Sequence, residues 1–197
     1  MKKTIEQIIN ASIAAKKRLI ESELDNIEKT VRLIENCISS GGKLLLFGNG
    51  GSAADSQHIA AEFVGRFRLE RKALPALALT TNTSTLTALA NDYGYDSSFK
   101  RQLEAFGDKG DVALAISTSG NAKNVIEAVK KAKEKGMKTV ALTGKDGGAL
   151  AKLCDISIIV DSRETARIQE SHILVGHIIA ELIESGLSRK KCDAPKK

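Results

Sequence analysis

Five short, uninterrupted apolar runs, separated by segments of helical periodicity, constrain the fold of this chain more than any other feature. The runs occupy residues 44–47, 76–79, 112–116, 139–142 and 156–160. Strands without polar alternation are buried on both faces, which is typical of a parallel sheet that lies between two layers of helices. The sequence therefore predicts an α/β fold, a three-layer sandwich around a five-stranded parallel sheet.

Helical patterns fill the intervals between these runs. We expect helices over residues 52–64, 84–90, 97–105, 121–135 and 164–186, with a short one near Ala149. Polar clusters follow the first four runs, with the sequences GNGGS, TTNTST, STSGN and TGKDGG. Because ligands of open parallel sheets bind at the carboxyl ends of the strands, these clusters indicate where a site would lie.

A long amphipathic pattern precedes the sheet. Apolar residues recur from Ile5 to Ile38, mostly at steps of three and four, and Gly41 and Gly42 end the pattern. One long helix or two helices in series would produce it. The helical segment could lie on its own domain, but its apolar stripe is longer than a small sheet can cover. We therefore favour residues 1–40 as oligomerisation helices that bury this stripe against copies of the same chain.

Length and composition limit the remaining possibilities. The 197 residues suit one domain, expected over 41–188 after the N-terminal helices. The net charge of +6 is concentrated in residues 189–197, which carry five basic side chains and one acidic one. Such an end is typical of a disordered tail rather than of a nucleic-acid site. Three cysteines without CxxC spacing, and no segment long enough to span a membrane, predict a cytoplasmic protein with no membrane partner.

The first apolar run leads through a glycine cluster into a helix. Asn49, Gly50, Gly51 and Ser52 form this junction. Glycines let the backbone approach a ligand closely, and the first N–H groups of a helix are unpaired and partly positive. The junction is therefore suited to an anion, most often a phosphate.

A second junction of this kind follows the third run. Ser117, Thr118 and Ser119 place three hydroxyl groups and a glycine before a helix. These residues could merely cap that helix. Two such junctions at neighbouring strand ends nevertheless favour a sugar-phosphate pocket. The chain lacks the lysine of a GxxxxGKS loop, which argues against a nucleoside triphosphate.

Histidine and glutamate side chains supply reactive groups. His58 and Glu62 lie four residues apart on the helix after GNGGS and therefore share one of its faces. A solvated glutamate and a structural histidine are the alternative. Their apolar neighbours, however, predict a largely buried helix, on which a carboxylate needs a partner. His172 and His177, on the last helix, face different directions, so we expect at most one of them to join His58.

Together these motifs resemble the phosphoheptose isomerases of the sugar-isomerase (SIS) domain superfamily. The resemblance rests on GNGGSAADSQHIAAE, ALTTNTSTLTALANDYGY, ISTSGNAKNV, TGKDGG and TARIQESHILVGH, and extends from the N-terminal helix to about Glu184. It implies a flavodoxin-like core, a homotetramer with N-terminal helices at its centre, and active sites between subunits. The implied reaction converts sedoheptulose 7-phosphate to D-glycero-D-manno-heptose 7-phosphate, the first step of nucleotide-activated heptose biosynthesis.

The resemblance also assigns roles to residues. It implies zinc as the cofactor and Glu62 with His177 as the acid/base pair. The implied zinc ligands are His58, Glu62, Gln169 and His177. The implied substrate-binding residues are Asn49, Gly50, Gly51, Ser52, Glu62, Asn91, Asp92, Ser117, Thr118, Ser119 and Gln169.

Physical considerations limit two of these assignments. Gln169 and His177 lie eight residues apart, about 12 Å along one helix axis, so one metal takes both only if each side chain leans inward or neighbouring subunits contribute. A histidine that gives its lone pair to zinc cannot use it as a base, which favours Glu62 as the main base. The family often has a serine where this chain has Ala122, which removes one hydroxyl from the phosphate site.

A binding protein is the alternative to an enzyme. The superfamily includes a protein that associates with the bacterial replication initiator DnaA, and regulators that sense sugar phosphates. A scaffold has no need for the His58 and Glu62 pair together with RIQE and His177. The isomerase interpretation is therefore preferred, with a sugar phosphate as substrate.

Overall fold

A computed structural model describes residues 1–192, with side chains to residue 187. All five predicted strands are present and form one parallel sheet in the order β2-β1-β3-β4-β5. This is the flavodoxin-like strand order, so the predicted fold is confirmed. The strands are β1 (Leu44–Gly48), β2 (Ala76–Ala78), β3 (Val112–Ser117), β4 (Lys138–Gly144) and β5 (Ile156–Val160).

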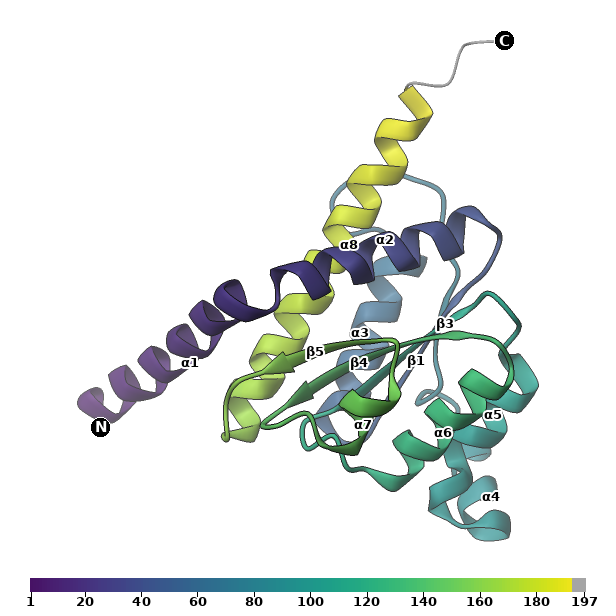
Figure 1. Ribbon diagram of the computed structural model, residues 1–197, viewed down its shortest axis with the longest axis horizontal. Helices are drawn as coiled ribbons and strands as arrows, with labels where there is room; N and C mark the ends of the chain where they lie inside the picture. Colours follow the sequence, from purple (N-terminus) through teal and green to yellow (C-terminus); the bar gives the residue numbers. More distant parts are fainter. Residues whose placement is uncertain (193–197) are drawn as a thin grey trace.

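Helices cover both faces of the sheet (Figure 1). One layer contains the N-terminal helices α1 (Lys2–Ser22) and α2 (Leu24–Ser39), with α3 (Gly51–Val64) and α8 (Thr165–Cys192). The other contains α5 (Ser98–Phe106), α6 (Lys123–Glu134) and α7 (Gly148–Leu153). Helix α4 (Thr83–Tyr93) and the 3-10 turn η1 (Tyr95–Ser97) lie beside this second layer.

Alternation of side chains along each strand builds two separate cores. On β1, Leu44 and Leu46 face the layer of α2, α3 and α8, whereas Leu45 and Phe47 face α5 and α6. All four side chains are fully buried. Burial on both faces explains why these strands show uninterrupted apolar runs instead of alternation.

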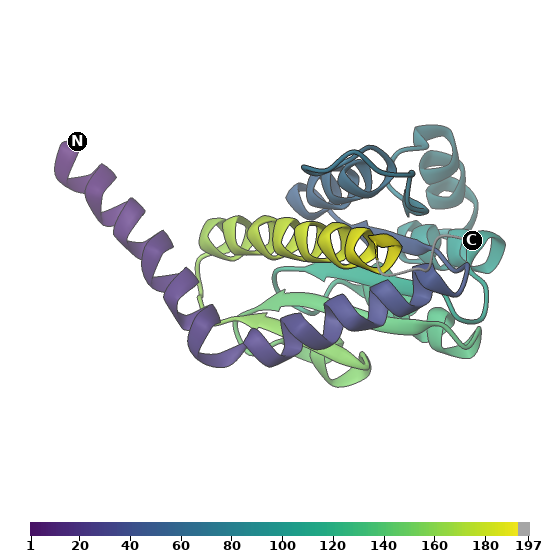
Figure 2. The ribbon, with the colours of Figure 1, turned by 90° about the horizontal axis from the view of Figure 1, so that it is seen from above.

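The N-terminal pattern forms two helices in series, separated at Glu23. Helix α2 packs on the sheet through Ile27, Val31 and Ile34, while α1 projects from the body of the protein (Figure 2). Most apolar residues of α1 therefore remain exposed in the single chain, including Ile5 and Ile9.

The last helix is longer than predicted. Helix α8 continues to Cys192, so the domain boundary expected at residue 188 falls inside a helix. The disorder expected of the tail from residue 189 onwards stays a prediction. Residues 193–197, the remainder of that predicted tail, lie outside the described part of the chain. None of the described helices combines the length and apolar content that a membrane span needs.

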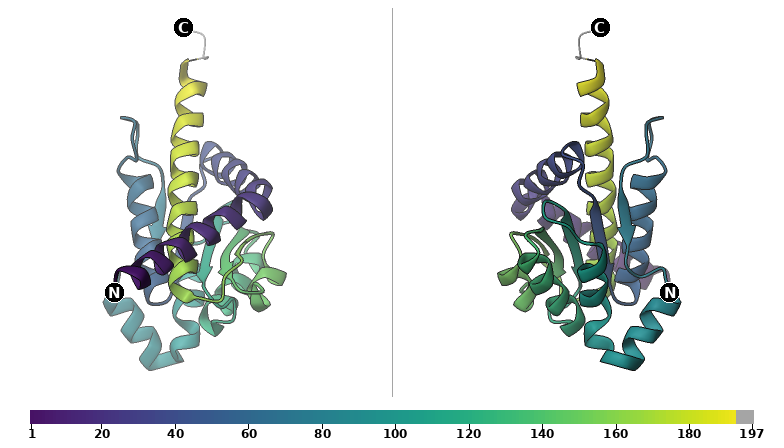
Figure 3. Two further views of the ribbon diagram at one scale, coloured as in Figure 1. Left: turned by 90° about the vertical axis from the view of Figure 1, so that its left-hand side faces the viewer. Right: turned by 90° about the vertical axis from the view of Figure 1, so that its right-hand side faces the viewer.

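Helices α3 and α8 run side by side in the same direction (Figure 3). Gly176 of α8 permits their close approach, because a Cβ atom there would lie 2.5 Å from Cδ1 of Ile59 on α3. The start of α3 lies against Gln169, its middle against Gly176, and the loop that follows it against Glu184. Side chains at the start, middle and end of α3 therefore each meet the corresponding part of α8.

Candidate active site

The two phosphate-type junctions lie next to each other at the carboxyl edge of the sheet. Strands β1 and β3 are paired in parallel up to Gly48 opposite Ile116. The strand order reverses between these two strands, and the crevice at such a reversal is where flavodoxin-like sheets bind ligands. The predicted juxtaposition of GNGGS and STSGN is therefore confirmed.

The junction after β1 is a tight turn that opens α3. Gly50 has a φ of +56°, and the N–H of Ser52 donates to the carbonyl of Asn49 over 3.0 Å. A Cβ atom on Gly51 would lie 2.2 Å from Nε2 of Gln169. Glycine at this position therefore leaves room for the Gln169 side chain, which brings the start of α8 to the anion loop.

The junction after β3 packs backbone against backbone on the β4–α7 turn. Gly120 has a φ of +64°, and a Cβ atom there would lie 2.0 Å from the carbonyl oxygen of Gly147. The N–H of Asn121 donates to Oγ of Ser119 over 3.2 Å. Ser117 is buried, whereas Thr118 and Ser119 are partly exposed at the edge. Ala122 precedes α6 at the N-cap position and supplies no side-chain cap.

Asn49 is held by two residues that the sequence did not single out. Its amide exchanges hydrogen bonds of 2.9 Å with the amide of Asn124, and the hydroxyl of Tyr95 donates to its Oδ1 over 2.8 Å. These bonds join the β1–α3 loop to the start of α6 and to η1. Asn49, Tyr95 and Asn124 follow no recognisable spacing in the sequence, so no pattern predicted these hydrogen bonds.

Asn91 and Asp92 lie on the exposed helix α4. The side-chain amide of Asn91 donates to Oδ1 of Asp92 over 2.8 Å. Tyr95, three residues beyond Asp92, contacts Asn49. Within the described chain, neither Asn91 nor Asp92 hydrogen-bonds to the two anion loops, so their predicted contact with a substrate stays a prediction.

His58, Glu62 and His177 converge where α3 and α8 touch. Nε2 of His58 lies 2.9 Å from Nε2 of His177 and 3.4 Å from Oε1 of Glu62. One ligand atom from each of the three residues lies within 4.8 Å of the others. His177 is thus the partner of His58, and Phe67, with its ring centroid 5.5 Å from that of His177, forms a wall of the cluster.

This cluster fits a divalent metal ion. Two imidazole nitrogens and a carboxylate oxygen are a donor set that zinc accepts. Two imidazole nitrogens at 2.9 Å otherwise have to share one proton, which a bound cation would replace. Gln169, the fourth predicted ligand, lies instead against Gly51, at the start of the α3–α8 contact.

His172 is excluded from the cluster. Its ring is buried and hydrogen-bonds through Nε2 to the carbonyl of Thr143 over 2.9 Å, on the sheet side of α8. Burial lowers the pKa of His172 to about 4, although the bond to Thr143 opposes this shift. The imidazole is therefore neutral and structural.

Asp55 is an acidic group near the cluster that sequence reasoning missed. It lies one turn before His58 on α3, and its Oδ2 is buried with no hydrogen-bond partner among the described residues. Burial raises the pKa of Asp55 to about 6, against the opposing effect of His58. Its neighbours on the helix are small or polar, so no periodicity indicated its burial.

The buried state of His172 predicts a pH effect on stability. Its pKa lies below the ordinary 6.5, so protonation favours the unfolded chain, and the free energy of unfolding falls as the pH drops from 6.5 towards 4. One such group contributes about 3 kcal/mol to the free energy of unfolding at neutral pH.

NMR titration of the histidine rings should show one ring that protonates only near pH 4. In His172→Gln, which keeps a donor for Thr143, unfolding should depend less on pH over this range. Protonation of His172 near pH 6.5 would contradict this.

Comparison with known proteins agrees with this geometry. The SIS domain family model matches residues 7–144. The phosphoheptose isomerase of Clostridium acetobutylicum is 52% identical over 195 residues, which cover 98% of this chain and 100% of that protein.

Solved structures show the same relationship. The phosphoheptose isomerase of Neisseria gonorrhoeae has a TM-score of 0.89 and 45% identity, and the match covers 93% of this chain and 98% of that one. That of Francisella tularensis has a TM-score of 0.90 and 36% identity, with 93% and 97% covered. The chain therefore belongs to the phosphoheptose isomerase family of SIS-domain proteins.

Proposed function

We propose that this protein is a ketose–aldose isomerase that converts sedoheptulose 7-phosphate to D-glycero-D-manno-heptose 7-phosphate. One observation carries the proposal: the helix that begins at the anion loop also carries two members of the His58, Glu62 and His177 cluster. A phosphorylated sugar has the same two-part character, with an anion at one end and reactive carbons at the other. The names of the similar proteins support this substrate class.

The phosphate end of the substrate would lie at the β1/β3 edge. Backbone N–H groups of the first turn of α3 and the hydroxyls after β3 are oriented for an anion there. The residues that we assign to substrate binding are Asn49, Gly50, Gly51, Ser52, Asn91, Asp92, Ser117, Thr118, Ser119 and Gln169. Binding energy at this end fixes the sugar so that its first two carbons face the cluster.

His58, Glu62 and His177 would hold zinc, with Gln169 as a fourth ligand. When bound, the ion would polarise the oxygens on the reacting carbons and stabilise negative charge that develops on them. Gln169 lies against Gly51 in the single chain. We therefore propose that the Gln169 side chain of a neighbouring subunit provides the fourth ligand. His58 and His177 also orient each other, since their rings pack edge to face at 5.1 Å.

Glu62 would move the proton. Its side chain is mostly buried, and Oε1 faces His58 at 3.4 Å, which leaves the second carboxylate oxygen for the substrate. Removal of a proton from C1 of the ketose gives an enediol, and return of a proton to C2 gives the aldose. His177 would serve as the second acid/base group only where its nitrogen is not engaged as a ligand.

A binding protein that associates with DnaA or senses a sugar phosphate is the less supported alternative. A pure binding site would need the two anion loops but not a convergent pair of histidines with a carboxylate. That cluster lies at the middle of the α3–α8 contact, apart from the phosphate loops. Binding of a sugar phosphate alone does not require reactive groups at this position.

We also propose that the chain forms a homotetramer through its N-terminal helices. Ile5, Ile9, Ile13 and Ile20 of α1 are exposed in the single chain. An apolar groove of about 330 Å³ lies beside them, lined by residues of α1, α2 and α8. A second copy of α1 has the matching apolar stripe, and assembly would bury both.

We further propose a cytoplasmic location. The free thiols of Cys37 and Cys154 support it, and cell fractionation would test it.

The direct test is turnover of sedoheptulose 7-phosphate, followed by NMR of the aldose product. Glu62→Gln, which keeps the size of the side chain but removes the base, should lower kcat by about 100-fold or more while the oligomer persists. The control is Glu134→Gln, which alters an exposed carboxylate on α6 and should leave kcat unchanged. Normal turnover by Glu62→Gln would remove this residue from the mechanism, and a wild-type protein without turnover would refute the proposed function.

Metal removal gives a second test. We expect metal analysis to find about one divalent ion per chain. Chelation should abolish turnover, and added zinc should restore it. His58→Ala and His177→Ala should both lose the ion, because each removes one of the clustered donors, whereas His172→Gln should retain it. Full activity after complete chelation would exclude a metal from the reaction.

The oligomer is tested by sedimentation. Ile9 and Ile13 lie on the exposed stripe, and replacing both with serine should shift the tetramer towards smaller species at micromolar concentration because the buried apolar area falls. A wild-type protein that sediments as a monomer would contradict the assembly, as would a double variant with unchanged behaviour.

A further inference from the structure

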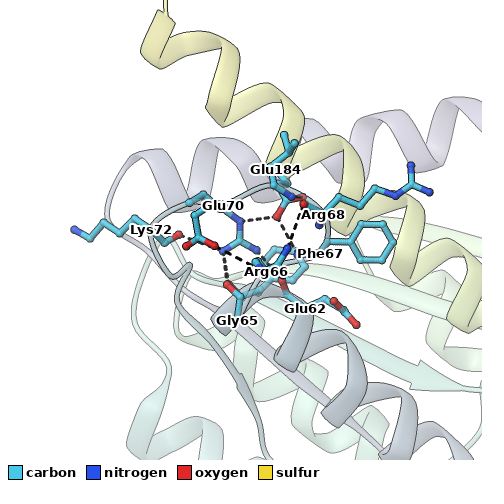
Figure 4. A network of polar contacts seen from close by, with 11 residues as sticks. Glu62, Gly65, Arg66, Phe67, Arg68, Glu70, Lys72 and Glu184 are labelled. Atoms are coloured by element: carbon cyan, nitrogen blue, oxygen red, sulfur yellow. Dashed lines mark hydrogen bonds and ion pairs between the residues drawn. The ribbon is translucent and has the colours of Figure 1, made fainter.

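A buried ion pair organises the loop between α3 and β2 (Figure 4). Nε of Arg71, in this loop, lies 3.1 Å from Oε1 of Glu184 on α8. The two side chains are only 7% and 1% exposed. Because ions are costly to bury, a pair this enclosed needs further partners for its remaining donors and acceptors.

The Glu184 carboxylate accepts hydrogen bonds from three consecutive backbone N–H groups. Phe67 donates to its Oε1 over 2.9 Å, while Arg68 and Leu69 donate to its Oε2 over 2.7 Å each. A carboxylate is a strong acceptor, and three successive donors can converge on it only when the chain curves around it. The path of the loop is thus fixed by one side chain of α8.

Arg71 binds the end of α3. Its Nη2 donates to the carbonyl of Glu62 over 2.7 Å, and its Nη1 donates to the carbonyls of Phe63 and Gly65 over 2.8 and 3.1 Å. The last carbonyls of a helix lack intrahelical partners and carry partial negative charge. The guanidinium group therefore caps the turn of α3 that bears Glu62.

The Arg71–Glu184 pair is also linked to His177, through Phe67. Phe67, whose N–H is held by Glu184, places its ring 5.5 Å from that of His177. Glu62 and His177 come from different helices. Arg71 contacts the backbone of Glu62, and Glu184 holds the backbone of Phe67, whose ring packs against His177. Neither Arg71 nor Glu184 belongs to the cluster itself.

We propose that Arg71 and Glu184 are positioning residues for the isomerisation: they fix the Glu62 carboxylate and the Phe67 wall relative to His177. This inference rests on the proposed function. Stability alone does not account for a buried ion pair, since apolar residues of similar volume are often as stabilising. What the pair adds is directional hydrogen bonding to backbone groups on both sides of the site.

The position of the pair predicts which kinetic constant it controls. The anion loop lies at the start of α3, a helix of 14 residues, and so about 20 Å from the turn that Arg71 caps. Loss of the cap should misplace Glu62 but leave the phosphate loops intact. The effect should therefore fall on kcat, with KM for the sugar phosphate little changed.

Two variants of the full-length protein test this. Arg71→Lys keeps the charge but cannot reach several carbonyls at once. The double variant Arg71→Met with Glu184→Gln removes both charges while preserving volume and an acceptor for the loop, so it avoids an unpaired buried ion. Arg32→Lys and Arg32→Met are matched controls, because Arg32 pairs with Glu28 on an exposed face of α2. Thermal unfolding first establishes that each variant is folded at the assay temperature.

We expect both Arg71 variants to lower kcat on the order of 10- to 100-fold, with KM and bound metal retained. Guanidinium at millimolar concentration should partly restore kcat to an Arg71→Ala variant, because it can occupy the vacated cap. Wild-type kcat in the folded Arg71→Lys and double variants would overturn the proposal, as would a change confined to KM. If the wild-type protein itself shows no turnover, the proposed function fails instead, which separates the two outcomes.

Discussion

The close parallel packing of α3 on α8 is the constraint on which the site depends. Gly176 lets Ile59 enter the contact, and the residues beside them, His177 and His58, then meet at hydrogen-bonding distance. A larger residue at Gly176 would have to displace Ile59, which is fully buried in the core beneath. The reactive cluster is thus a consequence of how two helices pack on one face of a parallel sheet.

Helix α3 gives the site its polarity. Its positive N-terminal end opens at the β1/β3 edge, where an anion is favoured, while its negative C-terminal end is capped by the Arg71 guanidinium. Between these ends the helix presents His58 and Glu62. One helix therefore sets the distance between a phosphate site and a proton-transfer site, which suits an extended phosphorylated sugar.

The fold was largely predictable because its determinants are local. Each apolar run became a strand, with boundaries that shift by one or two residues where hydrogen bonding decides them. Helix boundaries shifted as well: α6 begins at Lys123 rather than Asn121, because Ala122 has an extended backbone conformation. Helix α8 continues past residue 186, where it was expected to end, because basic side chains are compatible with a helix as well as with a disordered tail.

The site was predictable only in part, since its completion depends on contacts distant in sequence. The spacing of His58 and Glu62 placed them on one face, but two histidines of α8 were equal candidates until packing buried His172 against Thr143. Arg71 and Glu184 lie more than a hundred residues apart and belong to no motif, so no pattern could connect them.

Isomerisation in deuterated water tests whether the His58, Glu62 and His177 cluster transfers a proton. If Glu62 carries the proton through an enediol, sedoheptulose 7-phosphate should yield an aldose phosphate with deuterium at C2, because a carboxylate exchanges its proton with solvent between removal and return. NMR of the product measures this. Turnover with only hydrogen and no deuterium at C2 would indicate direct hydride transfer and would contradict proton transfer by Glu62.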